Sequence, residues 1–348
     1  MINDVQQECH VIFARRGAAY KLHLEMIMDV KFRKILIAID VLDRSIKPSP
    51  IGWKFIQDWI VAQDVEVEAV YVHPAGLESS SNRLNLKHRM NKFFEKARFL
   101  NLVRQKILVA DSVTAAEAPS VLAKYALEQS AEALVVMSHG RKFLRRWIMG
   151  SFAETLLKIS PVPVVFLGKS DVPSGEKRIL FATDFSPTSY EAFQIFLDEF
   201  ADENITVILC HAIPAPLPPL EDGVLSNQST ERKWVEVQMK ELVSEALSRG
   251  IQVHPIVEDV VSNVPKTILK VASRENVSLV GIVSKATKFE SAIFGTVAKK
   301  IFRSGKVTTW VCGPALLKGL HPQITNRRSH LQKTKRLMRE IGLRGAEK

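Results

Sequence analysis

The chain has 348 residues, a formal net charge of +11 at pH 7, 46% apolar residues and 24% charged residues. This length predicts two or three domains, and the composition is that of an ordinary soluble globular protein. The longest uncharged stretch, residues 205–220, contains four prolines. A membrane-spanning helix needs about 18 consecutive apolar residues, so the sequence excludes a chain that crosses a membrane.

Residues 1–30 precede the first predicted strand and contain no secretory signal, because basic residues interrupt every apolar run. We predict that translation starts at Met26 or Met28. The alternative is that residues 1–25 form a disordered N-terminal arm. An intact mass that includes Met1 would contradict the first interpretation.

The first predicted domain, residues 31–168, alternates strands with helices. Its strands are expected at residues 34–40, 65–73, 106–109, 133–137 and 162–167. Its helices are expected from Ser49-Pro50, after residue 85, at residues 117–129 and from Ser151. Strands that alternate with helices pair in parallel, so the fold class is predicted to be α/β with a doubly wound parallel sheet.

Residues 169–176 contain proline, serine and glycine and are predicted to be a linker. The second predicted domain, residues 177–313, repeats the same order. The turn from Asp184 to Pro187 ends a strand and caps a helix, and a long helix over residues 230–249 is stopped by Gly250. The strands of this domain are expected at residues 179–184, 204–211, 251–257, 278–283 and 307–312.

Three cysteines, Cys9, Cys210 and Cys312, do not have the spacing of a metal site. The last two end predicted strands of the second domain. We therefore expect small buried core residues in a reducing compartment, by default the cytoplasm.

An internal repeat relates the two domains. A shift of 145 residues places Gly295-Thr296 on Gly150-Ser151, Leu279 on Leu134 and Gly313 on Gly168, while Asp184 follows Asp40 by 144. The first domain carries 7 extra residues between its first strand and its first helix, so the matches between strands carry the argument. Five predicted strands in each half indicate two copies of one plan.

The segment 133–151 is predicted to form a strand, a loop containing Gly140 and Gly150, and the start of a helix. Free N–H groups at a helix start, with glycines that allow close approach, suit a phosphate. Four basic side chains lie between residues 141 and 146 and would favour a polyphosphate. Ligands of open parallel sheets bind where the strand order reverses, so Asp40 and Gly140 are predicted to share one crevice.

Because of this loop, and of Asp40 at the end of the first predicted strand, the chain resembles a tandem universal stress protein. The loop of that family is glycine, two residues, glycine, nine residues, glycine and then serine or threonine. Gly140, Gly150 and Ser151 match this pattern, whereas Met137 stands at the first glycine position. The resemblance implies a nucleotide site for ATP or AMP, with or without Mg²⁺, made by Asp40, Val136, Met137, Gly140, Arg141, Gly150 and Ser151. The alternative is a loop that keeps its fold without a ligand, because the Met137 side chain crowds the ribose.

The second domain departs further from the family pattern. Ile282 and Lys285 stand at its first two glycine positions, and only Asp184, Gly295 and Thr296 match. The resemblance therefore implies a degenerate and weaker site made by Asp184, Lys285, Gly295 and Thr296.

The resemblance also implies a cytoplasmic stress-response regulator whose two domains pair within one chain, as the family's subunits do between chains. Residues 162–166 and 307–311 are the expected edges of that pairing, and a further homodimer stays open. No nucleophile is paired with a base and no metal constellation is found, so no enzyme is predicted, although slow adenine-nucleotide hydrolysis stays open.

Residues 314–348 differ in composition from the rest of the chain. They carry nine Lys and Arg against two Glu, which is +7 of the total +11. One interpretation is a solvated, disordered tail. The other is a scaffold protein without a ligand, whose basic tail contacts nucleic acid or an acidic protein.

Overall fold

The computed structural model of the chain describes residues 33–40, 54, 65–75, 80–96, 103–110, 117–136, 151–168, 177–200, 204–213, 228–260, 263–284 and 296–317. Within these ranges no helix is long and apolar enough to span a bilayer. The helix predicted to follow Ser49-Pro50, the N-terminal arm and the predicted linker lie outside the described residues.

The first half alternates strands and helices as predicted. Its elements are β1 (Arg33–Ala38), β2 (Val65–His73), α3 (Ser80–Lys96), β3 (Val103–Val109), α4 (Ala118–Glu128), β4 (Ala133–Val136), α5 (Ser151–Ile159) and β5 (Val164–Phe166). Two elements differ from the prediction, because α3 begins inside the expected loop and β3 begins three residues earlier than expected.

The second half repeats this order. Its elements are β6 (Lys177–Ala182), α6 (Pro187–Phe200), β7 (Ile205–Ile213), α7 (Gln228–Ser248), β8 (Gln252–Asp259), α8 (Val264–Arg274), β9 (Leu279–Val283), α9 (Thr296–Ser304), β10 (Thr308–Cys312) and α10 (Pro314–Leu317). Helix α8 was not among the expected elements. Residues 314–317, the first residues of the predicted tail, form α10, which buries Ala315 and Leu316.

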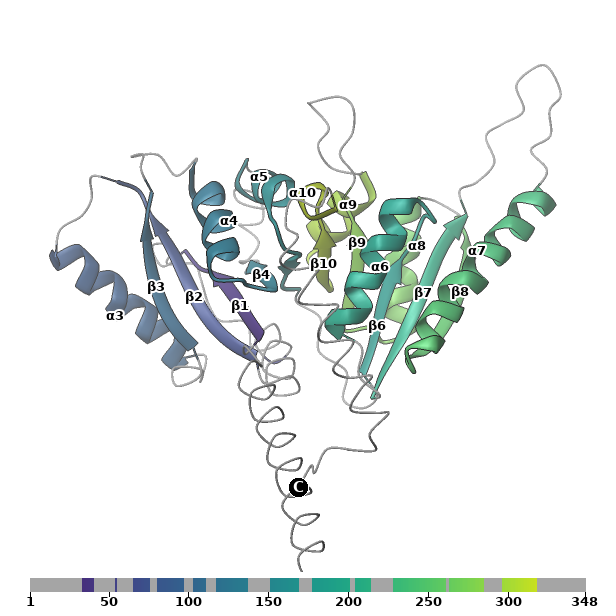
Figure 1. Cartoon of the computed structure of the whole chain (residues 1–348), viewed down its shortest axis with the longest axis horizontal. Coiled ribbons are helices and arrows are strands. Elements are labelled where there is room, and N and C mark those ends of the chain that lie inside the picture. Colours follow the sequence, from purple (N-terminus) through teal and green to yellow (C-terminus); the bar gives the residue numbers. More distant parts are fainter. Residues whose placement is uncertain are drawn as a thin grey trace, which may run out of the picture.

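All ten strands form one sheet in the order β3-β2-β1-β4-β5-β10-β9-β6-β7-β8 (Figure 1). Among the strands that the structure describes, neighbours are parallel within each half, and only β5 and β10 pair antiparallel. The predicted α/β class with two doubly wound halves is therefore confirmed. In each half the order reverses beside the first strand, between β1 and β4 and between β6 and β9.

The two halves join through β5 and β10, the edges expected from the resemblance. Val165 lies opposite Trp310, and Phe166 lies opposite Thr309. The N–H of Gly168 donates to the Thr308 hydroxyl at 3.1 Å. A Cβ atom on Gly168 would lie 2.3 Å from the carbonyl carbon of Val307, so a side chain at this position would force the two backbones apart.

Helices cover both faces of the sheet. On one face the buried side chains of α3, α6 and α7 pack against the strands, including Phe94, Phe193 and Met239. On the other face α4, α5, α8 and α9 supply a second cluster that includes Leu122 and Ile301. The alternation of side chains along each strand divides the core into these two layers.

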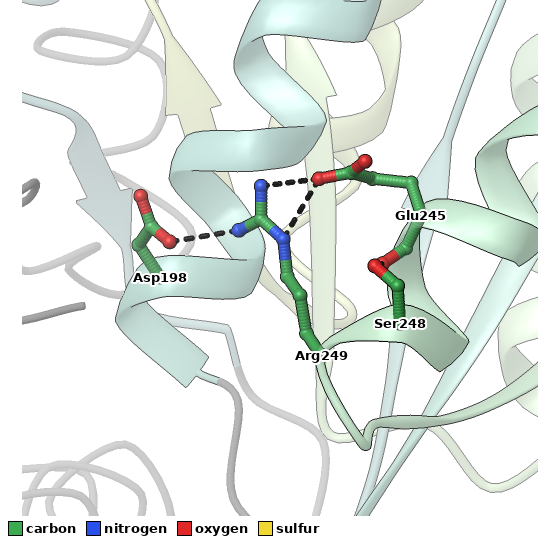
Figure 2. Close-up of polar contacts among 4 residues, drawn as sticks. All are labelled: Asp198, Glu245, Ser248 and Arg249. Atoms are coloured by element: carbon green, nitrogen blue, oxygen red, sulfur yellow. Dashed lines mark hydrogen bonds and ion pairs between the residues drawn. The ribbon is translucent and has the colours of Figure 1, made fainter. Parts of the chain in front are cut away.

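Arg249 fixes the end of α7 to α6 (Figure 2). Its Nη1 donates to Asp198 Oδ1 at 2.8 Å, while Nε and Nη2 donate to Glu245 Oε1 at 2.9 and 2.6 Å. Ser248 Oγ donates to the main-chain oxygen of Glu245 at 2.8 Å. A planar guanidinium can bridge two carboxylates in this way, so the arginine ties together the two helices that cover one face of the second half.

The outermost strands of the sheet are β3 and β8. Strand β8 contains Pro255, opposite Leu209 of β7, and a proline has no N–H to donate. Strand β3 carries Arg104 and Lys106, which lie opposite Glu68 and Val70. Prolines and charged side chains are common on edge strands.

Candidate functional site

The crevice predicted from the sequence lies at the carboxyl ends of β1 and β4. These strands are parallel neighbours, with Ala38 opposite Val136, and the strand order reverses between them. Asp40 follows β1 by two residues, after an Ile39 N–H that donates to the Val70 carbonyl at 3.0 Å. Because neighbouring parallel strands end at one edge of the sheet, the segment that carries Asp40 and the end of β4 at Val136 lie at the same edge.

The structure describes part of the predicted site. Asp40 is partly exposed, Val136 is buried, and Ser151 begins α5 as predicted. In the second half Asp184 is exposed and Thr296 begins α9. The other predicted site residues lie outside the described residues: Met137, Gly140, Arg141, Gly150, Lys285 and Gly295.

The charges of Asp40 and Arg89 both influence a phenol that was not expected to bear on the site, that of Tyr71. Burial raises the pKa of Tyr71 to about 12, with the Asp40 charge as the second cause and Arg89 acting in the opposite direction. Tyr71 lies on β2 and Arg89 on α3. The negative charge of Asp40 and the positive charge of Arg89 therefore act in opposite directions on the pKa of the Tyr71 phenol. The signal in the sequence was the position of Tyr71 near the end of a strand that pairs with β1.

The corresponding turn in the second half is a network of hydroxyl groups and one carboxylate. Asp184 Oδ1 accepts from the N–H of Ser186 at 3.1 Å and from its hydroxyl at 2.6 Å. The Ser186 oxygen accepts from the Ser189 N–H at 3.3 Å, so the predicted capping role at the start of α6 is confirmed. Asp184 is thus engaged in the turn itself.

Phe185 follows Asp184 and packs on the β7 side of β6, away from β9, where the strand order reverses. Its φ is 57°, in the left-handed region that a non-glycine residue rarely adopts, and its side chain is only 8% exposed. The ring lies 4.5 Å from the His211 ring and meets the Trp234 ring edge-on at 5.5 Å. His211 is itself fixed, because its Nδ1 donates to the Thr183 carbonyl at 2.9 Å. An aromatic stack therefore occupies the space between the ends of β6 and β7.

The register of the sheet corrects one equivalence between the halves. Leu36 pairs with Leu134, while its counterpart Leu180 pairs with Val280, so Leu134 corresponds to Val280 and not to Leu279. The cores agree, since Leu134 and Val280 lie in one cluster and Leu279 lies in the other. A shift of one residue reverses which face a side chain occupies.

This correction changes the comparison of the two loops. Ile282 becomes the counterpart of Val136, and it is buried at 3% exposure in the same core layer. Counted from the strand, Lys285 then corresponds to His139 instead of Gly140. Counted from these counterparts, Thr296 follows Ile282 by 14 residues and Ser151 follows Val136 by 15, so the segment of the second half is one residue shorter.

The two cysteines that the structure describes behave as core residues, as predicted. Cys210, within β7, and Cys312, at the end of β10, are both buried, and burial raises the pKa of the Cys210 thiol to about 12. Within the part of the chain that the structure describes, no cluster of three histidine, cysteine or carboxylate side chains could hold a metal ion.

Solved structures resemble the chain. A universal stress protein from Archaeoglobus fulgidus DSM 4304 shares 17% identity, covering 80% of this chain and 96% of its own, with a TM-score of 0.53. A protein of unknown function from Pseudomonas aeruginosa PAO1 shares 16% identity, covering 87% and 98%, with a TM-score of 0.55. At these identities the likeness concerns the fold.

A third similar structure is the universal stress protein from Archaeoglobus fulgidus in complex with dAMP. It shares 20% identity over 39% of this chain and 98% of its own, with a TM-score of 0.30. No protein with a curated description matches the sequence. The model of the universal stress protein family matches residues 31–167 and again residues 176–313. The chain therefore belongs to the universal stress protein family, with two copies of its domain.

Proposed function

We propose that this protein is a stress-response regulator that binds one adenine nucleotide, ATP or AMP, in the crevice of its first half. The carrying observation is that β1 and β4 are adjacent parallel strands at a reversal of strand order, with Asp40 two residues after the end of β1 and Val136 at the end of β4. The base would lie beside Asp40, and the phosphates would meet the loop from Gly140 to Ser151. The resemblance of that loop to the family's pattern supports the choice of ligand.

The charges of this crevice support the same proposal. The helix that begins at Ser151 directs its first N–H groups toward the end of the loop, and the N-terminus of a helix favours an anion. The Tyr71 phenol, whose pKa the Asp40 charge raises, would offer a further polar contact to a base or a ribose. This side chain would orient a bound nucleotide rather than act on it.

The second half is proposed to bind a nucleotide weakly or not at all. Phe185 follows Asp184 directly and is packed against His211 and Trp234, so a planar ligand that stacked beside Asp184 on the β7 side would have to displace it. Displacing it would expose a buried aromatic ring, which costs about 2 to 3 kcal/mol. We therefore expect one nucleotide for each chain.

The experiment compares two equivalent carboxylates by titration calorimetry with ATP and with AMP. Asp40→Asn should lower the affinity about tenfold or more, because a hydrogen bond to a charged group contributes about 1.5 to 3 kcal/mol. Asp184→Asn is the matched control and should leave both affinity and stoichiometry unchanged. Absence of binding heat with the wild-type chain would refute the proposal, as would a loss of affinity in the control alone.

A loop variant tests the phosphate end of the same site. Gly140→Arg places a long side chain where the phosphates would approach the backbone, and binding heat should disappear. If Asp40→Asn weakens binding but Gly140→Arg does not, the nucleotide would contact the crevice without using the loop.

A second proposal concerns the charge of residues 318–348, which carry +7 of the net charge of +11. We propose that this segment contacts an acidic partner, such as nucleic acid. Deleting residues 318–348, which spares α10, should abolish DNA or RNA binding whose affinity falls steeply with salt. Unchanged binding after the deletion would contradict this proposal.

A further inference from the structure

The pairing of the two halves follows the internal repeat closely. Val165 lies directly opposite Trp310 across the β5–β10 pair, and these residues differ by 145, the spacing of the repeat. In an antiparallel pair of equivalent strands, a residue lies opposite its own counterpart only on the local two-fold axis. Val165 and Trp310 therefore mark the axis that relates the halves.

A second pair of counterparts meets in the helical layer above this axis. Glu154 of α5 and Lys299 of α9 also differ by 145, and Lys299 Nζ lies 3.0 Å from Glu154 Oε1. Both side chains are about one-third exposed, at 30% and 32%. The repeat thus carries opposite charges at a helical position where its two copies contact each other.

The strand layer shows a difference of size at the same axis. Trp310 is fully buried, its Nε1 donates to Glu199 Oε2 at 2.7 Å, and its ring meets Phe196 edge-on at 5.3 Å. Its counterpart Val165 is also fully buried but much smaller. One large and one small side chain fill the space that two equal side chains would have to share.

We propose that the axis of the paired halves selects unlike partners, so that the β5 edge accepts β10 and rejects a second β5. Two first halves would bring Glu154 against Glu154, and two second halves would bring Lys299 against Lys299. Like charges in direct contact disfavour association. Two tryptophans would overfill the strand layer at the axis, and two valines would leave it underpacked. The inner edges of one chain therefore pair with each other rather than with the equivalent edge of another copy.

The intact chain can imitate each like pair by a single substitution. Lys299→Glu gives the charges of two first halves, and Glu154→Lys gives the charges of two second halves. The double variant, Glu154→Lys with Lys299→Glu, restores opposite charges with their places exchanged. Because these side chains are partly exposed, the variants are expected to fold.

Hydrogen exchange of the peptides that cover Val164–Phe166 and Thr308–Cys312 reports opening of the joint. Each single variant should exchange about fivefold faster there than wild type, which corresponds to about 1 kcal/mol. The double variant should return to within about twofold of wild type. In about 1 M salt, where the screening length is about 3 Å, the three variants should converge.

A matched ion pair within the second half provides the control. Arg178 Nη1 lies 3.3 Å from Glu275 Oε2, with exposures of 36% and 18%, and Arg178→Glu should leave exchange at the joint unchanged. The proposal is overturned if Arg178→Glu accelerates exchange there as much as Lys299→Glu does. It is equally overturned if the double variant is no slower than the single variants. Neither result depends on whether a nucleotide binds.

Discussion

Phe185 is a position where glycine should be better tolerated than alanine. Its φ of 57° costs a non-glycine residue about 1 to 2 kcal/mol, yet the side chain is 92% buried against His211 and Trp234. Removing a buried phenyl ring costs about 3 to 5 kcal/mol, which exceeds the backbone strain. The wild-type phenylalanine is therefore expected to be more stable than either small residue.

The order of the two small residues tests the backbone argument. Phe185→Ala loses the ring and keeps the strain. Phe185→Gly loses the ring and relieves the strain. Its greater conformational entropy in the unfolded chain, however, lowers the stability by about 0.5 to 1 kcal/mol. The glycine variant should be more stable than the alanine variant by about 0.5 to 1 kcal/mol, the reverse of the usual order.

Urea unfolding of the three proteins, followed by tryptophan fluorescence and circular dichroism, measures both differences. Ala192→Gly is the control, because this residue lies inside α6 and its replacement should cost about 1 kcal/mol. If Phe185→Ala proves as stable as Phe185→Gly, or more stable, the left-handed turn carries no strain and the explanation of this turn is wrong.

Three further predictions follow from contacts in the cores. Arg249→Ala should lower the free energy of unfolding by about 1 kcal/mol. Arg249→Lys should lower it by nearly as much, because an ammonium group cannot bridge Asp198 and Glu245 as the guanidinium does. Equal stability of wild type and Arg249→Lys in urea would contradict this. Gly281→Ala should cost about 1 to 3 kcal/mol, because its Cβ would lie 2.6 Å from Cε2 of Phe196, and adding Phe196→Leu should recover part of the loss in thermal unfolding. The Tyr71 phenol has a pKa of about 12, above its unfolded value of about 10, so its contribution to stability is complete below pH 10 and is lost as the pH rises toward 12. Asp40→Asn should lower this pKa, measured as the phenolate absorbance that Tyr71→Phe removes.

The order of the elements could be predicted because strand and helix periodicities are local and each half carries them twice. The start of α5 at Ser151 follows from such signals, and β1 ends at Ala38, two residues before the predicted end at Asp40. Helix α8 was missed although its signals are present: Asn263 caps it by accepting from the Lys266 N–H at 3.1 Å. The apolar stripe of α8 is short and is interrupted in the sequence by exposed polar residues such as Lys266 and Lys270, so its helical periodicity was not recognised.

The parts that could not be predicted depend on long-range packing. A count of residues cannot show that the segment after β9 is one residue shorter than its counterpart after β4. The pairing of Leu180 with Val280 does show it. The left-handed turn at Phe185 is unfavourable for its own backbone, and only the tertiary stack makes it stable. The influence of the Asp40 charge on Tyr71 could be recognised only once the pairing of β1 with β2 was known.

The outer strands of the sheet have a consequence for the behaviour of the protein at high concentration. A long sheet with bare edges is a template for fibrils, because each open edge can recruit another strand. Here Pro255 interrupts the row of donors on β8, and Arg104 and Lys106 place two cations on β3. Both edges therefore disfavour the addition of another strand, and we expect the protein to form no fibrils at high concentration.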